Sequence, residues 1–220
     1  MIELRNVTKY FRTTKGKKYI LKNSTFTIPS DHNVGILGRN GAGKSTLMRM
    51  LGKIEFPNKG EIVSDKSFSW PMGLGGGFQG NMTGRSNVKF VCRIYGKSSK
   101  EIEESIAFVK KFSELGDYFE MPIKTYSSGM KSRLTFGLSL AFDFDYLLID
   151  ETLSVGDARF RKKSKEALMK KIETCNVLLV SHDMGTLRTI CDVGIVSHEA
   201  KLHYFDDIND AIKMYDDINI

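Results

Sequence analysis

The feature that most limits how this chain can fold is a glycine-rich run at residues 38–45, with the sequence GRNGAGKS. It fits the pattern G-x-x-x-x-G-K-[ST], follows an apolar run at 34–37 and precedes an amphipathic segment at 45–51. Glycines let the backbone curl so that successive N–H groups converge on phosphate oxygens, helped by the positive end of the helix dipole. The alternative is a glycine turn that merely precedes a lysine. The flanking strand and helix patterns favour a phosphate loop.

Two side chains of this loop have expected chemical roles. We expect Lys44 to contact the β and γ phosphates of a nucleotide, and the Ser45 hydroxyl to be a magnesium ligand. The residues predicted to surround the nucleotide here are Gly38, Arg39, Asn40, Gly41, Ala42, Gly43, Lys44, Ser45 and Thr46.

Two later apolar runs also end in polar residues. The run at 146–149 is followed by Asp150 and Glu151, so we expect Asp150 to hold magnesium and Glu151 to polarise the attacking water. Helix N-terminal charge is the alternative for this pair, and the phosphate loop disfavours it. The run at 177–180 is followed by Ser181 and His182, which makes His182 a candidate sensor of the γ phosphate.

Short apolar runs alternate with helical patterns, which predicts an α/β fold with a mostly parallel sheet and a phosphate-loop NTPase core. Residues 2–11 and 20–28 are expected as antiparallel strands at the N-terminus, and residues 194–197 with 202–205 as a hairpin before a helix from about 208. Residues 84–143 are predicted to form a helical sub-domain inserted in a single domain spanning 1–220. There, Ser98 and Glu101 suggest a capping box, and Gly116 is expected to end that helix.

Composition indicates the cellular environment and the kinds of partner that the protein can have. The chain has 220 residues and a net charge of +7, and many of its cations lie at 159–171, where a solvated helix face is favoured over a binding patch. Three widely spaced cysteines suggest neither disulfides nor zinc, which fits a reducing cytoplasm. No run of about 18 apolar residues occurs, and residues 1–5 lack the apolar stretch expected of a signal peptide. Any work at a membrane is therefore expected to need a partner.

The segment at 125–131, TYSSGMK, resembles the signature of ABC ATPases, a Ser-Gly turn that opens a helix about twenty residues before Asp150. An ordinary helix cap is the alternative for this segment. Gln79 matches the glutamine of the Q-loop, residues 154–157 match the D-loop with Asp157 as its acidic residue, and His182 matches the switch histidine. The chain is thus identified as a member of the ABC ATPases, with ATP and Mg²⁺ as cofactors.

The resemblance implies roles for residues outside the phosphate loop. A homodimer is expected to hold two ATP molecules, each between the phosphate loop of one copy and Ser127, Ser128 and Gly129 of the other. Gln79 is expected beside the nucleotide and its metal. The commonest signature has other residues at Ser128 and at Met130, so the contacts of these two positions stay open. An aromatic residue near the start should stack on adenine, and Phe11 is preferred over Tyr10.

More narrowly, the chain resembles the ATP-binding subunits of capsular polysaccharide exporters of Gram-negative bacteria, the KpsT type, over nearly its whole length. The segments that carry this resemblance are residues 36–47, 69–71, 75–85, 121–130 and 155–160. It implies export of a lipid-linked polysaccharide through an integral membrane permease, with this chain peripheral at the cytoplasmic face of the inner membrane. The alternatives are an exporter of O-antigen or teichoic acid, or a soluble ABC ATPase acting on nucleic acid or ribosomes. No nucleic-acid partner is expected.

Overall fold

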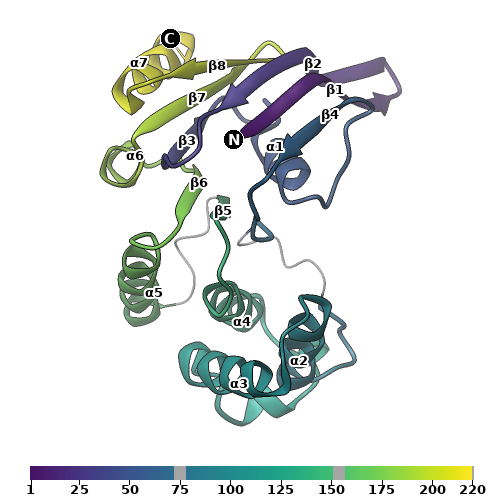
Figure 1. Ribbon diagram of the computed structural model, residues 1–220, viewed down its shortest axis with the longest axis vertical. Helices are drawn as coiled ribbons and strands as arrows, with labels where there is room; N and C mark the ends of the chain where they lie inside the picture. Colours follow the sequence, from purple (N-terminus) through teal and green to yellow (C-terminus); the bar gives the residue numbers. More distant parts are fainter. Residues whose placement is uncertain (72–77, 151–156, 220) are drawn as a thin grey trace. The chain divides into compact units, whose positions relative to one another are not determined.

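The structure is a computed structural model that describes residues 1–71, 78–150 and 157–219 (Figure 1). The chain divides into two compact units. The first comprises Met1–Pro71, Phe144–Glu151 and Cys175–Ile220, and the second comprises Met72–Asp143 and Thr152–Thr174. The predicted fold class is confirmed, because one antiparallel sheet and one mostly parallel sheet occur together with helices.

The N-terminal sheet of the first unit is antiparallel, in the order β2-β1-β4. Its strands are β1 (Ile2–Thr13), β2 (Gly16–Ile28) and β4 (Lys59–Ser64). β1 and β2 extend past the predicted strands to a two-residue turn at Thr14 and Lys15. β4 was not predicted, because its side chains are exposed or half-buried and its sequence lacks an apolar run.

The larger sheet of the first unit positions the candidate site. Its order is β5-β6-β3-β7-β8, from β5 (Tyr146–Asp150), β6 (Asn176–Val180), β3 (Val34–Leu37), β7 (Val193–His198) and β8 (Lys201–Phe205). The first four strands are parallel, and β8 returns antiparallel to β7 as the predicted hairpin. Parallel strands buried on both faces read as continuous apolar runs, which is why these runs were visible in the sequence. Their carboxyl ends meet at one edge of the sheet.

Within the described part of the first unit, the helices that pack on this sheet are α1 (Lys44–Leu51), α6 (Met184–Ile190) and α7 (Ile208–Asn219). α7 lies beside β7 in Figure 1. α7 also approaches β3 closely, because Gly35 of β3 has no side chain and a Cβ there would lie 2.6 Å from Ile208 Cδ1. The N–H of Ile208 bonds to the carbonyl of Asp192, just before β7, so α7 starts at the beginning of that strand.

The second unit is helical. It contains α2 (Gly84–Ile94), α3 (Ser99–Ser113), α4 (Ser128–Leu140) and α5 (Ala158–Lys171), with short 3₁₀ turns η1 (Gly116–Glu120) and η2 (Ile123–Thr125). Both bonds of the predicted capping box are present at Ser98 and Glu101. The expected stop at Gly116 was wrong, because α3 already ends at Ser113 and its C-cap, Glu114, takes the left-handed conformation with φ 53°.

Aromatic rings hold the helices of this unit together. Phe112 of α3 stacks on Phe136 of α4 with ring centroids 5.9 Å apart, and meets Phe160 of α5 edge-on at 5.6 Å. All three rings are buried. Among the described residues, no helix combines the length and the apolar character needed to cross a membrane.

Candidate functional site

The phosphate loop leaves β3 and enters α1, as the sequence predicted. Gly38 has φ 151°, and a Cβ there would lie 2.7 Å from the carbonyl oxygen of Ser197 at the end of β7. Gly43 has φ 101° and packs directly against the side chain of Ile20 of β2. Both glycines are therefore required by backbone conformation and by close neighbours. The loop is clamped between β7 on one side and the N-terminal sheet on the other.

Lys44 turns back into this loop. Its ammonium donates hydrogen bonds to the carbonyl oxygens of Gly38, at 2.6 Å, and Arg39, at 3.3 Å, and the side chain is only 8% exposed. A buried cation at the beginning of α1, next to a curl of backbone N–H groups, favours an anion. Ser45 is half-buried and Thr46 is buried in the first turn of α1. This geometry suits the phosphates of a nucleotide.

A polar cavity of about 400 Å³ lies beside the loop. The residues that line it are Arg39, Asn40, His182, Tyr215 and Asn219. The strand order explains why His182 is here, because β6 pairs with β3 and both strands end at the same edge. The structure thus brings His182 together with two predicted loop residues. Tyr215 and Asn219 were missed, and their spacing of four residues on α7 is the only sequence signal that links them.

Asp150 is the last residue of β5 and is paired in register with Val180 of β6. Its half-buried carboxylate therefore ends at the same sheet edge as the phosphate loop, with β6 between β5 and β3. Glu151, predicted to act on the attacking water, lies outside the described residues.

The hairpin of β1 and β2 presents Phe11 and Tyr10 on opposite faces. Tyr10 is paired with Tyr19, their ring centroids are 5.6 Å apart, and Lys17 Nζ lies 4.5 Å from the Tyr10 ring. Phe11 is paired with Lys18 and is 40% exposed. Phe11 therefore projects from the same face as Lys18, whose Nζ lies 3.5 Å from a Cβ placed on Gly41 of the phosphate loop.

The signature segment lies in the second unit. Ser127 is the N-cap of α4, and its Oγ accepts a hydrogen bond from the N–H of Met130 at 3.2 Å. Ser127 and Ser128 are exposed and Gly129 is half-buried, and apart from its chain neighbours and the helix backbone the nearest described atom to a Cβ placed there is Ser127 Oγ, at 3.9 Å. Ser127 thus caps α4, which both the signature interpretation and the helix-cap alternative allow. The segment is also accessible, as contact with a second copy requires.

Gln79 is exposed, and its backbone is held by Asn87 of α2. The N–H of Gln79 donates to Asn87 Oδ1 at 2.8 Å, and Asn87 Nδ2 donates back to the Gln79 carbonyl at 3.2 Å. Asn87 is fully buried and was missed by the sequence analysis, where an asparagine inside a helix gives no distinctive signal. Residues 75–77, which belong to the predicted Q-loop, lie outside the described residues.

Asp157 is the N-cap of α5, and its carboxylate accepts hydrogen bonds from the N–H of Phe160 at 2.9 Å and from Arg133 at 2.8 Å. The bond from the Phe160 N–H and the nearby Arg133 hold the pKa of Asp157 below its ordinary value. This residue of the predicted D-loop is thus joined to the signature helix α4, while residues 154–156 lie outside the described residues.

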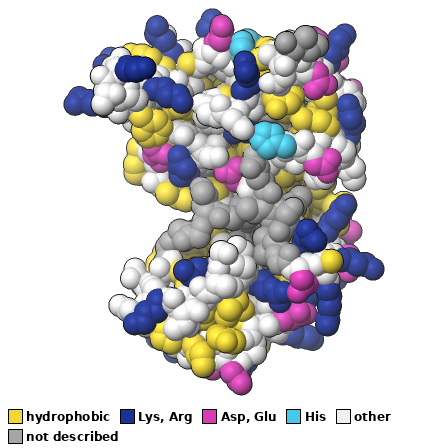
Figure 2. Space-filling model, turned by 180° about the vertical axis from the view of Figure 1, so that it is seen from behind, with side chains coloured by type: hydrophobic (Ala, Val, Ile, Leu, Met, Phe, Trp, Pro, Cys, Tyr) yellow, Lys and Arg dark blue, Asp and Glu magenta, His cyan; other side chains and the backbone are white. Residues whose placement is uncertain are grey.

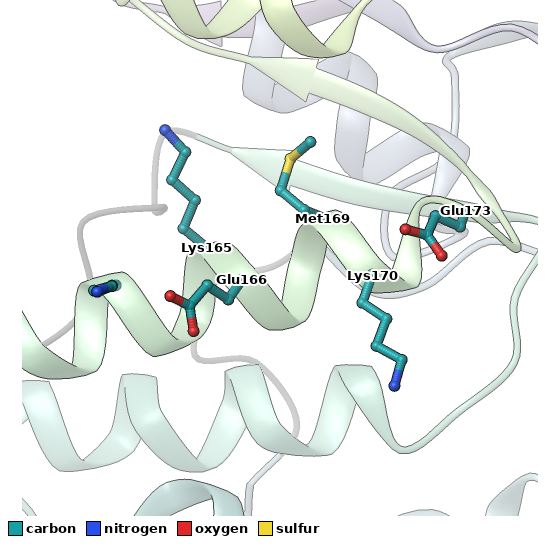
Figure 3. A pocket seen from close by; sticks show the side chains of 6 residues that line it. Lys165, Glu166, Met169, Lys170 and Glu173 are labelled. Carbon is teal, nitrogen blue, oxygen red and sulfur yellow. The ribbon is translucent and has the colours of Figure 1, made fainter.

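A larger cavity, of about 570 Å³, runs along α5 (Figure 3). Its lining has mixed charge, and Figure 3 shows Lys165 and Lys170 pointing to different sides of the helix. Two other cations of the basic stretch are paired, Lys163 with Glu114 and Lys171 with Asp143. Figure 2 likewise shows basic and acidic side chains interspersed on the face that it presents. These arrangements do not converge on an anion.

Comparison with known proteins indicates the same family as the sequence motifs do. Residues 21–154 match the family model described as ABC transporter. The polysialic acid transport ATP-binding protein KpsT of Escherichia coli is 50% identical over 224 residues, covering 100% of both chains. BexA of Haemophilus influenzae is 44% identical over 217 residues, covering 99% of each. Proteins that export teichoic acids or O-antigen are more distant, at 34% and 35% identity. A dimeric ATP-binding cassette bound to ADP and phosphate superposes with a TM-score of 0.76 at 22% identity, over 94% of this chain and 99% of the other.

Proposed function

This chain belongs to the ABC transporter family as the ATPase subunit of a capsular polysaccharide exporter, and from this premise we propose that it works as a homodimer with two ATP molecules at its interface. Each ATP would lie on the phosphate loop of one copy and face residues 127–129 of the other. The observation that carries the proposal is the convergence of Lys44, turned into the loop, with a polar cavity lined by Arg39 and His182.

Each side chain of the site has a proposed task in the hydrolysis of ATP to ADP and inorganic phosphate. Lys44 and the loop N–H groups hold the β and γ phosphates. Glu151 accepts the proton of the attacking water, and His182 donates a hydrogen bond to the γ phosphate as charge develops on it. Phe11 stacks on adenine, since it is exposed on the loop-facing side of the hairpin while the Tyr10 ring is packed against Tyr19 and Lys17.

Magnesium fits the donors beside the phosphate loop. The Ser45 hydroxyl and the Asp150 carboxylate are oxygen donors, which Mg²⁺ prefers, and we propose the side-chain oxygen of Gln79 as a further donor. The ion would neutralise charge on the β and γ phosphates. The chain's own residues then order the triphosphate and the attacking water.

Nucleotide-dependent closure would drive the membrane partner. The γ phosphate bridges two copies through Ser127 and Gly129, so binding favours the closed dimer and hydrolysis removes the bridge. We propose that the Q-loop region around Gln79 and the helical unit transmit this change to an integral permease. The chain would then be peripheral at the cytoplasmic face of the inner membrane.

The experiment compares ATP-dependent dimerisation of wild type with that of two variants. Glu151→Gln should hold an ATP-bound dimer with little turnover, and Lys44→Ala should weaken ATP binding, as measured by size-exclusion chromatography, calorimetry and phosphate release. Glu166→Gln, on the exposed face of α5, is the control and should behave as wild type. Wild-type turnover by Glu151→Gln, or unchanged ATP affinity of Lys44→Ala, would contradict the assigned roles.

The same protein preparations can distinguish the transporter proposal from the alternative, a soluble ATPase that acts on nucleic acid. The transporter proposal expects recovery of the chain with membranes that contain its permease and no salt-dependent binding of duplex DNA or RNA. The opposite pair of results would favour the soluble class.

A further inference from the structure

We propose that Lys18 is a further nucleotide-positioning residue, whose ammonium contacts the phosphate groups of the ATP held by the phosphate loop. The inference rests on the proposed function of that loop. It concerns a residue of the β1–β2 hairpin, well before the loop in sequence.

The register of the hairpin decides which way Lys18 points. Phe11 and Lys18 are direct partners across the antiparallel pair, and direct partners project from the same face of a sheet. Ile20 lies two residues after Lys18, at a register shift between Tyr19 and Leu21, so its direction follows from its contact with Gly43 and not from strand alternation. Because Ile20 packs onto Gly43 and Lys18 lies near Gly41, both side chains are turned toward the phosphate loop.

The ammonium of Lys18 lies close to the phosphate loop. A Cβ placed on Gly41 would lie 3.5 Å from Lys18 Nζ, which is ordinary contact distance. Gly41 has φ 80° and is exposed, so the ammonium lies over an open glycine of the loop. Lys18 and Ile20 therefore meet two alternate glycines of the loop, Gly41 and Gly43.

The charge around Lys18 leaves it available for an anion. Residues 12–18 contain four cations and no acidic residue. Lys9, on the same face, differs in this respect, because its buried ammonium forms a 2.8 Å ion pair with Glu55. No carboxylate lies within ion-pair distance of Lys18 in the described ranges of the chain. An unpaired ammonium above a loop rich in N–H groups adds positive potential where phosphate would bind.

Lys17 provides a matched comparison. It is the adjacent residue, equally charged and exposed, but its ammonium lies over the ring of Tyr10 on the opposite face of the hairpin. Removing the charge of Lys17 changes the net charge of the hairpin as much as removing that of Lys18. A difference between the two variants then reports position rather than general electrostatics.

The experiment measures ATP, ADP and adenosine binding by calorimetry at low ionic strength for wild type, Lys18→Gln, Lys18→Arg and Lys17→Gln. We expect Lys18→Gln to weaken ATP and ADP binding about fivefold, as loss of one exposed charge contact allows, and to leave adenosine binding unchanged. Lys18→Arg should bind ATP nearly as wild type does, and Lys17→Gln within about twofold. In ATPase assays, KM for ATP should rise for Lys18→Gln with kcat nearly constant.

Equal ATP affinity of Lys18→Gln and wild type would overturn the inference, as would equal losses for Lys17→Gln and Lys18→Gln. Lys44→Ala is carried alongside to separate this result from a failure of the proposed function. If Lys44→Ala loses ATP affinity while Lys18→Gln does not, the phosphate loop stands and only the role of Lys18 is rejected. If wild type does not bind ATP, both are rejected.

Discussion

The Oγ of Ser197, at the end of β7, donates a 2.9 Å hydrogen bond to the carbonyl oxygen of Ala42 inside the phosphate loop. Ser197 is 4% exposed, and its own carbonyl oxygen is the atom that Gly38 approaches. One residue of a neighbouring strand therefore fixes the loop at two points. The loop's curvature is maintained by the sheet as well as by its glycines.

Removing this bond should loosen the loop. We expect Ser197→Ala to weaken ATP binding about fivefold, because a hydrogen bond of this kind contributes about 1 kcal/mol. Calorimetric titration with ATP measures the change. Thr189→Ala removes a comparable hydroxyl-to-carbonyl bond, to Gly185 within α6, and should leave ATP affinity unchanged. Equal ATP affinities of the two variants would show that Ser197 does not hold the loop.

Asn87 should be the main support of the backbone around Gln79. Its buried amide donates to the carbonyl oxygens of Gln79, Met82 and Thr83, and its Oδ1 accepts the N–H of Gln79. Asn87→Ala would leave buried polar groups unsatisfied, and we expect a loss of about 2 kcal/mol in the free energy of unfolding. Chemical denaturation measures it. The exposed Asn81 supplies the control, Asn81→Ala, and a similar loss in both variants would count against this assignment.

The cluster of Lys9, Arg49 and Glu55 should make stability depend on pH. Burial raises the pKa of Glu55, but hydrogen bonds from Lys9 and Arg49 outweigh it and leave the pKa below the ordinary value of 4.5. A lowered pKa in the folded state means that the stabilisation is complete above 4.5 and is lost as pH falls through the folded-state value. Denaturation of wild type should therefore show a decline in stability in that range.

Glu55→Gln tests this cluster directly. We expect it to lower the free energy of unfolding by about 2 kcal/mol at neutral pH and to reduce the decline on acidification, because Lys9 is left with an uncompensated charge at either pH. Glu61→Gln is the control, since Glu61 is exposed and lies 3.4 Å from Arg5. An acid decline as steep in Glu55→Gln as in wild type would exclude Glu55 as its source.

The sequence predicted those elements whose residues are in uniform environments. The buried runs of β3, β5 and β6 were found nearly to the residue, because parallel strands are apolar throughout. β4 was missed because an exposed edge strand carries the same polar residues as a loop. The end of α3 was misplaced because Glu114, not a glycine, takes the left-handed conformation there.

The site residues also fall into two groups, those that a local motif predicts and those that only the tertiary structure reveals. Lys44 and His182 were predicted because each follows a recognisable apolar strand, and the strand order brings His182 to the loop. Ser197, Asn87 and Lys18 could not be predicted, since each acts through a contact made by tertiary packing and lies in no local pattern. Motifs identify the groups that we propose to contact the nucleotide, whereas the residues that hold those groups depend on the fold.

Arg133 joins the signature helix α4 to Asp157, the last residue of the predicted D-loop. Its guanidinium donates to Asp157 at 2.8 Å and lies 4.4 Å from the centre of the Phe160 ring. The Arg133 side chain is 18% exposed. Its guanidinium is therefore held by the Phe160 ring and the Asp157 carboxylate at the same time. Lysine cannot reproduce a planar group that stacks and donates at once. Arg133→Lys should therefore lose most of the function of Arg133 despite keeping its charge.

In the proposed dimer, residues 127–129 meet ATP only when two copies close, whereas a single copy binds ATP through the phosphate loop. Arg133→Lys should accordingly lower kcat about fivefold, a change of about 1 kcal/mol in the barrier, while ATP affinity of the separate subunit stays as in wild type. Steady-state ATPase assays and calorimetry give the two quantities. Lys111→Gln, at an exposed position in the last turn of α3, is the control and should leave both unchanged. If Arg133→Lys instead lowered ATP affinity with kcat intact, Arg133 would support nucleotide binding within one copy, and its proposed effect on closure would be wrong.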